Sequence, residues 1–242
     1  MGFIIVPIIF FGIVWLAFVL KSSESFKEKR INAGRADDLK YLSIKHNNPF
    51  SRKADKALRK KLSRYNLAFP FSPKIRNVTT LMVHGFKTET FDYSYQASGE
   101  MNAPLIEIGG LVISFDGYPF PQFCISQQNE LIQSPLIGGD EISQSQLPEW
   151  ASKVSIKTSK KNTQQVRDFL ESDPAVIDII NAPFVQWLFF NKDFILLYFS
   201  DPLPDDDSYF SIAFEHAAAI IDLYGAKFSP EIQLKNLKKD QD

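Results

Sequence analysis

The sequence predicts an α+β protein with an N-terminal transmembrane helix, a basic helical stalk, and then a mainly antiparallel sheet covered by helices. Three observations predict this class. Residues 2–20 carry no charge. Residues 21–76 carry 16 Lys and Arg against 5 Asp and Glu, whereas residues 77–242 carry 11 against 23. From residue 78 onward, short runs rich in β-branched and aromatic residues alternate with turn residues, as in antiparallel sheets.

The uncharged N-terminal run predicts the anchor. Its nineteen residues would span about 28 Å as a helix, at about 1.5 Å per residue, which matches a hydrocarbon core of roughly 30 Å. A cleaved signal peptide would need a positively charged region before the apolar run and small residues at its end. Only Met1 and Gly2 precede the large apolar residues of this run, which begin at Phe3 and end in Phe18-Val19-Leu20. We therefore expect an uncleaved transmembrane anchor over residues 1–20.

Basic residues next to the anchor predict its orientation, because Lys and Arg are retained on the cytoplasmic side. None precedes the run, whereas six follow within twenty residues: Lys21, Lys27, Lys29, Arg30, Arg35 and Lys40. The expected protein is a single-pass protein of the cell membrane, with its N-terminus outside and its soluble domain in the cytoplasm. The one cysteine, Cys124, excludes an intrachain disulfide and agrees with a reducing compartment.

The change of charge along the chain predicts four segments. They are an anchor (1–20), a basic stalk with a juxtamembrane helix (21–76), a soluble α+β domain (77–228) and a polar tail (229–242). The excess of acidic residues in the soluble domain argues against nucleic acid as a partner, because nucleic-acid affinity comes largely from neutralising phosphates.

The pattern at residues 51–67 predicts an amphipathic helix. Ala54, Leu58, Leu62 and Tyr65 form one apolar stripe. The other positions carry Lys53, Lys56, Arg59, Lys60 and Arg64. Such a helix can lie on the membrane surface or pack on its own domain. The narrow stripe, without Phe or Trp, favours packing, and a weak contact with anionic lipid stays open.

The first half of the soluble domain is predicted to form four successive antiparallel strands. Residues 78–86 and 89–96 are expected to form a hairpin around Lys87-Thr88, followed by strands at 105–115 and 122–127. In the second strand, aromatic residues alternate with polar ones. This alternation places Phe91, Tyr93 and Tyr95 on a single face of the sheet.

The second half mixes helices and strands. A short strand is expected at 153–157, helices at 164–171 and 175–181, and a strongly apolar hairpin at 184–190 and 194–199. After the acidic loop 201–207, a longer helix can begin at Ser208 and end at Gly225. Its pattern predicts that it covers one face of the sheet and turns Phe210, Phe214 and Ile221 toward it.

The run Gly138-Gly139-Asp140-Glu141-Ile142 is similar to the Gly-Gly-Asp-Glu-Phe signature hairpin of diguanylate cyclases. Those enzymes also need metal- and nucleotide-binding residues upstream. Here Ile142 replaces the Phe, and no upstream acidic element of that kind is found. We therefore interpret the run as an acidic glycine turn.

Other reactive residues lack the spacing that chemistry requires. His46, His84 and His216 form no zinc motif. Asp201, Asp205, Asp206 and Asp207 lack the pattern of a calcium loop. Cys124 lies in an apolar run, where cysteine acts as a small hydrophobe. The sequence therefore assigns no catalytic, cofactor-binding or metal-binding residue, and no cofactor.

In its organisation, the chain resembles uncharacterised bacterial single-span membrane proteins with a cytoplasmic domain of unknown function. Its most distinctive runs are Val83-His84-Gly85, the segment 91–95 and the segment 118–123. The resemblance implies a bacterial membrane setting and names no catalytic residue.

Two hypotheses of function follow. The first is a membrane-anchored cytoplasmic interaction or scaffold protein with a partner in a membrane complex. The second is an envelope-associated enzyme or small-ligand binder whose site gathers residues distant in sequence, such as Asp92, Asp116 and the aromatic side chains. A deep pocket with converging polar groups would favour the second hypothesis, and filled sheet faces would favour the first.

Overall fold

The computed structural model describes residues 33–63, 74–96, 105–115, 120–127, 140–142 and 147–225. They form a mainly antiparallel sheet with helices, which confirms that part of the expected fold. The expected anchor (1–20) and polar tail (229–242) lie outside these residues. No helix within them has the length and apolar character needed to cross a membrane.

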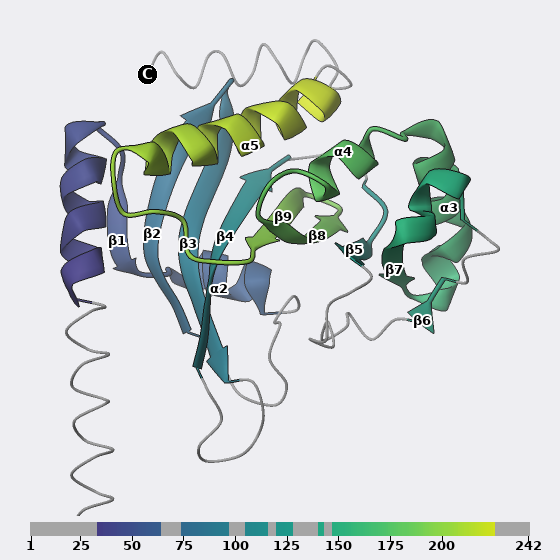
Figure 1. Ribbon diagram of the computed structural model, residues 1–242, viewed down its shortest axis with the longest axis horizontal. Helices are drawn as coiled ribbons and strands as arrows, with labels where there is room; N and C mark the ends of the chain where they lie inside the picture. The colour runs from purple at the N-terminus through teal and green to yellow at the C-terminus, as the bar shows by residue number, and fades with distance from the viewer. Residues whose placement is uncertain are drawn as a thin grey trace, which may run out of the picture.

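Nine strands of the described residues form one sheet in the order β1-β2-β3-β4-β9-β8-β5-β7-β6 (Figure 1). All neighbouring strands are antiparallel. The strands are β1 (Phe50–Lys53), β2 (Lys74–Val83), β3 (Phe86–Gln96), β4 (Leu105–Ser114), β5 (Phe123–Gln127), β6 (Asp140–Glu141), β7 (Val154–Thr158), β8 (Val185–Asn191) and β9 (Phe194–Phe199).

Helices lie against both faces of this sheet. An unlabelled helix covers residues 33–45, and the others are α2 (Lys56–Leu62), α3 (Thr163–Ser172), α4 (Val176–Ile180) and α5 (Ser208–Gly225). In Figure 1, α5 crosses the sheet on the near side, the helix 33–45 stands beside β1, and α2 lies behind the strands. The expected covering of one sheet face by the C-terminal helix is therefore confirmed.

The first hairpin turns earlier than the sequence suggests. β2 and β3 are joined at His84-Gly85, between the paired residues Val83 and Phe86, and not at Lys87-Thr88. Both turn residues have positive φ, 47° and 81°. Two positive φ values give a turn whose twist matches that of the strands, and glycine favours it. The expected turn position was wrong because Lys87-Thr88 is polar but continues the strand.

The four expected strands do not lie side by side in chain order. β4 pairs with β9, and β5 pairs with β8 and β7, so that the hairpin β8-β9 separates β4 from β5. All six residues of β9 are buried. A strand that is apolar on both faces belongs at the centre of a sheet, which explains the insertion.

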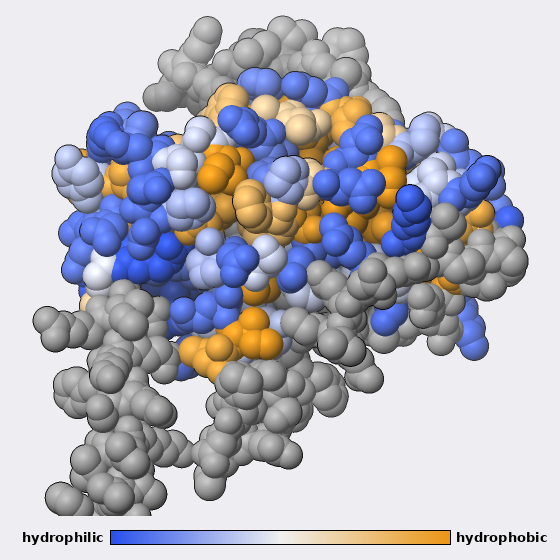
Figure 2. Space-filling model, viewed as in Figure 1, coloured by the Kyte–Doolittle hydropathy of each residue, from blue (hydrophilic) through white to orange (hydrophobic). Residues whose placement is uncertain are grey.

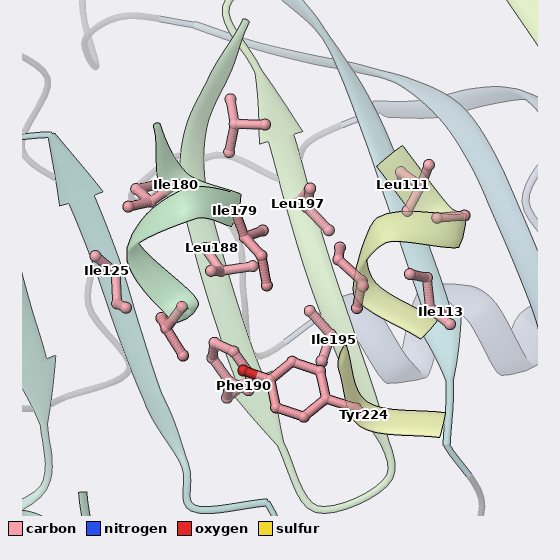
Figure 3. Packing of buried hydrophobic residues seen from close by; sticks show 14 of the residues in the cluster. Leu111, Ile113, Ile125, Ile179, Ile180, Leu188, Phe190, Ile195, Leu197 and Tyr224 are labelled. Carbon is pink, nitrogen blue, oxygen red and sulfur yellow. The ribbon is translucent and has the colours of Figure 1, made fainter. Parts of the chain in front are cut away.

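Two hydrophobic cores occupy the two faces of the sheet. One core, which we call the helix-covered core, joins α5 and α4 to the strands, with Tyr224 of α5 near Phe190 and Ile195 (Figure 3).

The opposite core, which we call the aromatic core, includes Phe91, Tyr93, Tyr95, Trp187, Phe189 and Tyr198. Phe91, Tyr93 and Tyr95 thus share one face, as predicted. Gly110 leaves room for the Phe91 ring, since a Cβ there would lie 2.3 Å from it.

The inward face of α5 differs from the expected one. Tyr209, Ala213 and Ala217 are buried, whereas Phe214 is 44% exposed and lies edge-on to His84. Ile221 is buried as expected, and Phe210 is partly buried against the helix-covered core. The prediction for Phe214 was wrong because α5 carries apolar residues on both sides, and its small alanines allow close packing on the sheet.

The expected helix at 51–67 begins later than predicted. Residues 50–53 form β1 and pair with β2. The helix α2 starts after Asp55, whose side chain accepts a hydrogen bond from the Leu58 amide at 2.7 Å, an N-terminal cap. Leu58 and Leu62 are buried in the aromatic core. The apolar stripe therefore packs on the domain, and Arg64 and Tyr65 lie outside the described residues.

Candidate functional site

The site that joins the basic segment 21–76, which we call the basic arm, to the sheet is centred on Arg35, a residue of the helix 33–45. Its Nε and Nη2 atoms donate to the two carboxylate oxygens of Asp92 on β3, each at 2.8 Å. Nη2 also donates to the backbone oxygen of Leu203, at 2.7 Å. The side chains of Arg35 and Asp92 are only 14% and 13% exposed. A planar guanidinium suits such a two-point contact, so this pair fixes geometry as well as charge.

A bulge in β2 supplies a further hydrogen bond to the same carboxylate. The register between β2 and β3 shifts between Arg76 and Thr79, and Asn77 within this interval has a positive φ of 52°. Asparagine tolerates this conformation better than most residues. The Asn77 side-chain amide donates to Asp92 Oδ2 at 2.8 Å. The bulge therefore places Asn77 so that Asp92 accepts three hydrogen bonds.

Three carboxylates of the acidic loop 201–207 contact three different groups. Asp205 lies 3.6 Å from Arg35 Nη1, and Asp207 Oδ1 lies 2.6 Å from Lys45 Nζ. Asp206 accepts hydrogen bonds from the hydroxyl and the backbone amide of Ser208 at the start of α5, and these bonds lower the pKa of the Asp206 carboxyl. Two of these aspartates thus hold the basic helix, and one caps α5.

We call this group of residues the tether junction: Arg35, Lys45, Asn77, Asp92, Asp205 and Asp207. Beside it lies a buried network of hydroxyl groups. The Tyr209 hydroxyl lies 2.5 Å from Thr90 Oγ1, which contacts the backbone oxygen of Thr79, and Ser43 Oγ lies 3.4 Å from Thr79 Oγ1. Burial raises the pKa of Tyr209 to about 12. The network links the helix 33–45 to β2, β3 and α5.

The second basic element, α2, has no comparable ion pairs. Lys56, Arg59 and Lys60 are exposed, and no carboxylate forms an ion pair with any of them within the described residues. Lys61 differs, because its Nζ donates to Ser114 Oγ at 2.8 Å and lies 5.4 Å from the centre of the Phe194 ring. We define Lys56, Arg59 and Lys60 as the basic face of α2.

A small open pocket lies between α2 and the first strands. Its volume is about 130 Å³, and it is lined by Pro49, Phe50, Ser51, Lys53, Asp55, Leu58, Val78, Thr80 and Glu89. Glu89 is already paired with Lys87 at 2.9 Å. Sites for small molecules commonly enclose roughly 300 to 1,000 Å³. This pocket is too small for a ligand of ordinary size.

The structure places the candidate residues of the sequence in separate environments. Asp92 belongs to the tether junction, while Asp116, Gly138 and Gly139 lie outside the described residues. Cys124 is buried in the aromatic core. Within the described residues, no three His, Cys, Asp or Glu side chains gather closely enough to hold a metal ion.

The three histidines each contact a different phenylalanine. His46 lies against Phe210, His84 against Phe214 and His216 against Phe199. Burial lowers the pKa of His216, which Glu215 opposes by its charge. His84 Nδ1 also lies 3.2 Å from Asp222 Oδ1, a contact between two exposed side chains. The three histidines lie in separate places and form no shared site among the described residues.

In the sequence, the central residue of the site, Arg35, was identifiable only as one of several positive charges. Arg35 counted there as one of six basic residues after the anchor, and its partner Asp92 lies 57 residues away. The opposite charges of arm and domain were the one signal that the two attract each other. They do not specify which residues meet.

No protein-family model matches the sequence, and no curated protein is significantly similar to it. A solved structure with a related fold is the crystal structure of the mycobacterial trehalose monomycolate transport factor A, TtfA, with a TM-score of 0.52. The alignment covers 79% of this chain and 94% of the TtfA chain, at 11% sequence identity. At that identity, the chain is similar to TtfA in its fold.

Proposed function

We propose that this chain is a membrane-anchored interaction protein of the cell envelope that assists lipid transport together with a membrane-protein partner. In this proposal, residues 1–20 form the anchor and the folded domain lies in the cytoplasm. The observation that carries the proposal is the tether junction, in which Arg35 binds the basic arm to β3 and to the acidic loop. These bonds make the helix 33–45 part of the folded domain, so that the chain leaves the domain toward the proposed anchor at a fixed point.

The lipid-transport setting rests on the fold that the chain shares with TtfA, whose name describes it as a trehalose monomycolate transport factor. An interaction role is favoured over an enzyme by the interior of the domain. Both faces of the sheet carry packed cores, and the pocket beside α2 holds only about 130 Å³. Within the described residues, filled sheet faces leave little room for a substrate.

The outward side of the helix 33–45 offers a surface for the partner. Tyr41 and Ile44 are 68% and 69% exposed and lie three positions apart, on neighbouring sites of one helical face. The surroundings are mostly hydrophilic, as Figure 2 shows for the region near β1, whereas hydrophobic side chains gather around α5 and α4. An exposed apolar pair on the first described helix after the anchor suits contact with a neighbouring membrane protein.

Recovery of the partner from solubilised membranes tests this proposal. The tagged full chain should recover one membrane protein in stoichiometric amount, and the double variant Tyr41→Ser, Ile44→Ser should recover at least about tenfold less, a loss of about 1.4 kcal/mol. Phe184→Asn is the matched control, because Phe184 is 63% exposed, lies just before β8 and has a positive φ that asparagine accepts. Equal recovery by all three proteins, or recovery of no membrane protein by the unmodified chain, would contradict the proposal.

The expected topology has its own test. A reporter that is active only in the cytoplasm should be active when fused after Asp242, and removal of residues 1–20 should release the protein from membranes. Activity of a periplasmic reporter alone would overturn the orientation. Retention of the shortened protein on membranes at high salt would show that residues 1–20 are not the main anchor.

A further inference from the structure

We propose that the basic face of α2 rests on the anionic lipid headgroups of the membrane that holds the anchor. This inference depends on the proposed anchoring and adds a second point of attachment. Lys56, Arg59 and Lys60 point outward from a helix whose opposite side is packed on the sheet. The exposed side chains of Lys53 on β1 and of Lys74 at the start of β2 add positive charge on neighbouring elements.

The contact is electrostatic and does not insert into the bilayer. Insertion requires a free apolar side, but Leu58 and Leu62 are 2% and 0% exposed and lie in the aromatic core. The exposed positions of α2 and its two caps are Asp55, Lys56, Ala57, Arg59, Lys60 and Ser63. Ala57 is the one wholly apolar side chain among these exposed positions, so the helix can meet headgroups only.

The charges of this face are available because nearby acidic groups are already used. The Asp55 side chain caps α2 by accepting from the Leu58 amide, and Asp37 pairs with Arg52. The carboxylates of the acidic loop that hold basic side chains bind the helix 33–45 instead. Among the described residues, Lys56, Arg59 and Lys60 thus stay without ion-pair partners. Basic clusters beside an anchor are attracted by the anionic surface of the cytoplasmic leaflet.

The anchor keeps this face close to the membrane. Twelve residues separate Leu20, the end of the expected anchor, from the first described residue at position 33. At about 3.3 to 3.6 Å per residue, they reach at most about 43 Å. A tether this short makes the second contact effectively intramolecular, so that weak attractions between charges suffice to orient the domain.

The test places a dye on the proposed contact in the full chain. Ala57→Cys carries a fluorophore between the basic residues, and Glu171→Cys on α3, at the other end of the sheet in Figure 1, serves as the distant control. Cys124 is buried, and the unmodified chain should take up no dye. The labelled proteins are placed in nanodiscs, with or without phosphatidylglycerol, that carry a headgroup-linked quencher.

Quenching of the dye at position 57 is expected in the anionic nanodiscs alone. It should disappear at 1 M salt, where charges are screened over about 3 Å. The triple variant Lys56→Gln, Arg59→Gln, Lys60→Gln should lose most of the quenching. Its matched control, Lys153→Gln, Lys160→Gln, Lys161→Gln, removes the same charge elsewhere and should keep it. The dye at position 171 should stay unquenched throughout.

Equal quenching in neutral and anionic nanodiscs, no quenching at position 57, or insensitivity to the triple variant would each overturn the proposed lipid contact. A chain that fails to enter nanodiscs would instead overturn the proposed anchor. In that event, salt-sensitive binding of the full chain to phosphatidylglycerol vesicles that the triple variant abolishes would still support the contact. Absence of such binding would reject it.

Discussion

The two helices of the basic arm use their positive charges differently. The helix 33–45 directs Arg35 and Lys45 into ion pairs with Asp92 and Asp207. In α2, Lys56, Arg59 and Lys60 remain without such pairs among the described residues. The difference follows from the position of the acidic loop, which runs beside the first helix only. Net charge alone therefore does not say whether a basic segment stabilises its own domain or is free to bind something else.

The two helices also differ in how far they expose apolar side chains. The helix 33–45 leaves Tyr41 and Ile44 outward, whereas α2 buries Leu58 and Leu62 and exposes only Ala57. One helix thus presents an apolar surface that suits a protein partner. The other presents charge that suits a layer of anionic headgroups.

The largest effect is expected where α2 meets the aromatic core. Leu58→Ala removes a side chain that is 2% exposed, and we expect a loss of about 2 to 5 kcal/mol in the free energy of unfolding because a cavity replaces it. Urea unfolding measures this change. Ala57→Ser, one position away on the exposed side, should stay within about 0.5 kcal/mol. Similar small values for both variants would show that α2 is not docked.

The next effect concerns the tether junction. Arg35→Ala leaves Asp92 largely buried with Asn77 as its remaining side-chain donor, and we expect a loss of about 2 to 3 kcal/mol. Arg59→Ala on α2 removes the same type of charge from an exposed site and should change stability by no more than about 0.5 kcal/mol. Equal losses in the two variants would remove the distinction between the helices.

A double-mutant cycle attributes this loss to the pair itself. Arg35→Ala and Asp92→Ala should together cost less than the sum of the single variants, with a coupling of at least about 1 kcal/mol. Additive losses would show that the two side chains contribute independently.

A smaller effect is expected from the hydroxyl network beside the junction. Tyr209→Phe removes the hydroxyl that contacts Thr90, and the expected loss near neutral pH is about 1 kcal/mol. The pKa of Tyr209 in the folded protein is about 12, above its usual value of about 10. Its contribution is complete below pH 10 and falls as pH rises from 10 to 12, because only the unfolded chain has then lost the proton.

Unfolding measured against pH in this range checks the prediction. The unmodified chain should lose stability more steeply than Tyr209→Phe, by up to about 1.4 kcal/mol per pH unit. Tyr198, whose pKa burial also raises well above its usual value, gives both proteins the same additional slope. Parallel curves for the two proteins would contradict the raised pKa of Tyr209.

The smallest effect is expected for the basic face of α2. Because Lys56, Arg59 and Lys60 have no ion pairs within the described residues, replacing all three by Gln should change the thermal midpoint by no more than about 2 °C. The same variant should lose the lipid contact proposed above. A marked drop in the midpoint would mean that this face is held by carboxylates of its own domain.

Local patterns predicted the elements better than their arrangement. The hairpin β8-β9 was found because two apolar runs flank a polar turn at 191–193, and α5 was found because its apolar pattern is long and Ser208 and Gly225 mark its ends. The side chain that accepts from the first amide of α5 is that of Asp206 and not that of Ser208. The inward face of α5 was misassigned, since large aromatic residues suggested a buried stripe while Ala213 and Ala217 made the close contact.

Local sequence patterns do not reveal which strands or side chains pair when they lie far apart in the sequence. The separation of β4 from β5 by the hairpin β8-β9 depends on which strand is buried on both faces, and the alternation within β5 does not reveal its neighbours. The pair of Arg35 and Asp92 likewise depends on the bulge at Asn77 and on the course of the acidic loop. The sequence indicated that the arm and the domain attract each other, but it did not indicate which residues form the contact.

Hydrogen exchange of the full chain tests most directly whether the helix 33–45 is part of the folded domain. The amides of residues 37–45 should exchange with nearly the same free energy of opening as those of β3, because Arg35 joins the helix to β3 and the Ser43–Thr79 contact joins it to β2, the partner strand of β3. Arg35→Ala should lower the protection of the helix more than that of β3. Rapid exchange throughout residues 37–45, with β3 protected, would show that the arm is a loose stalk and would contradict the tether junction.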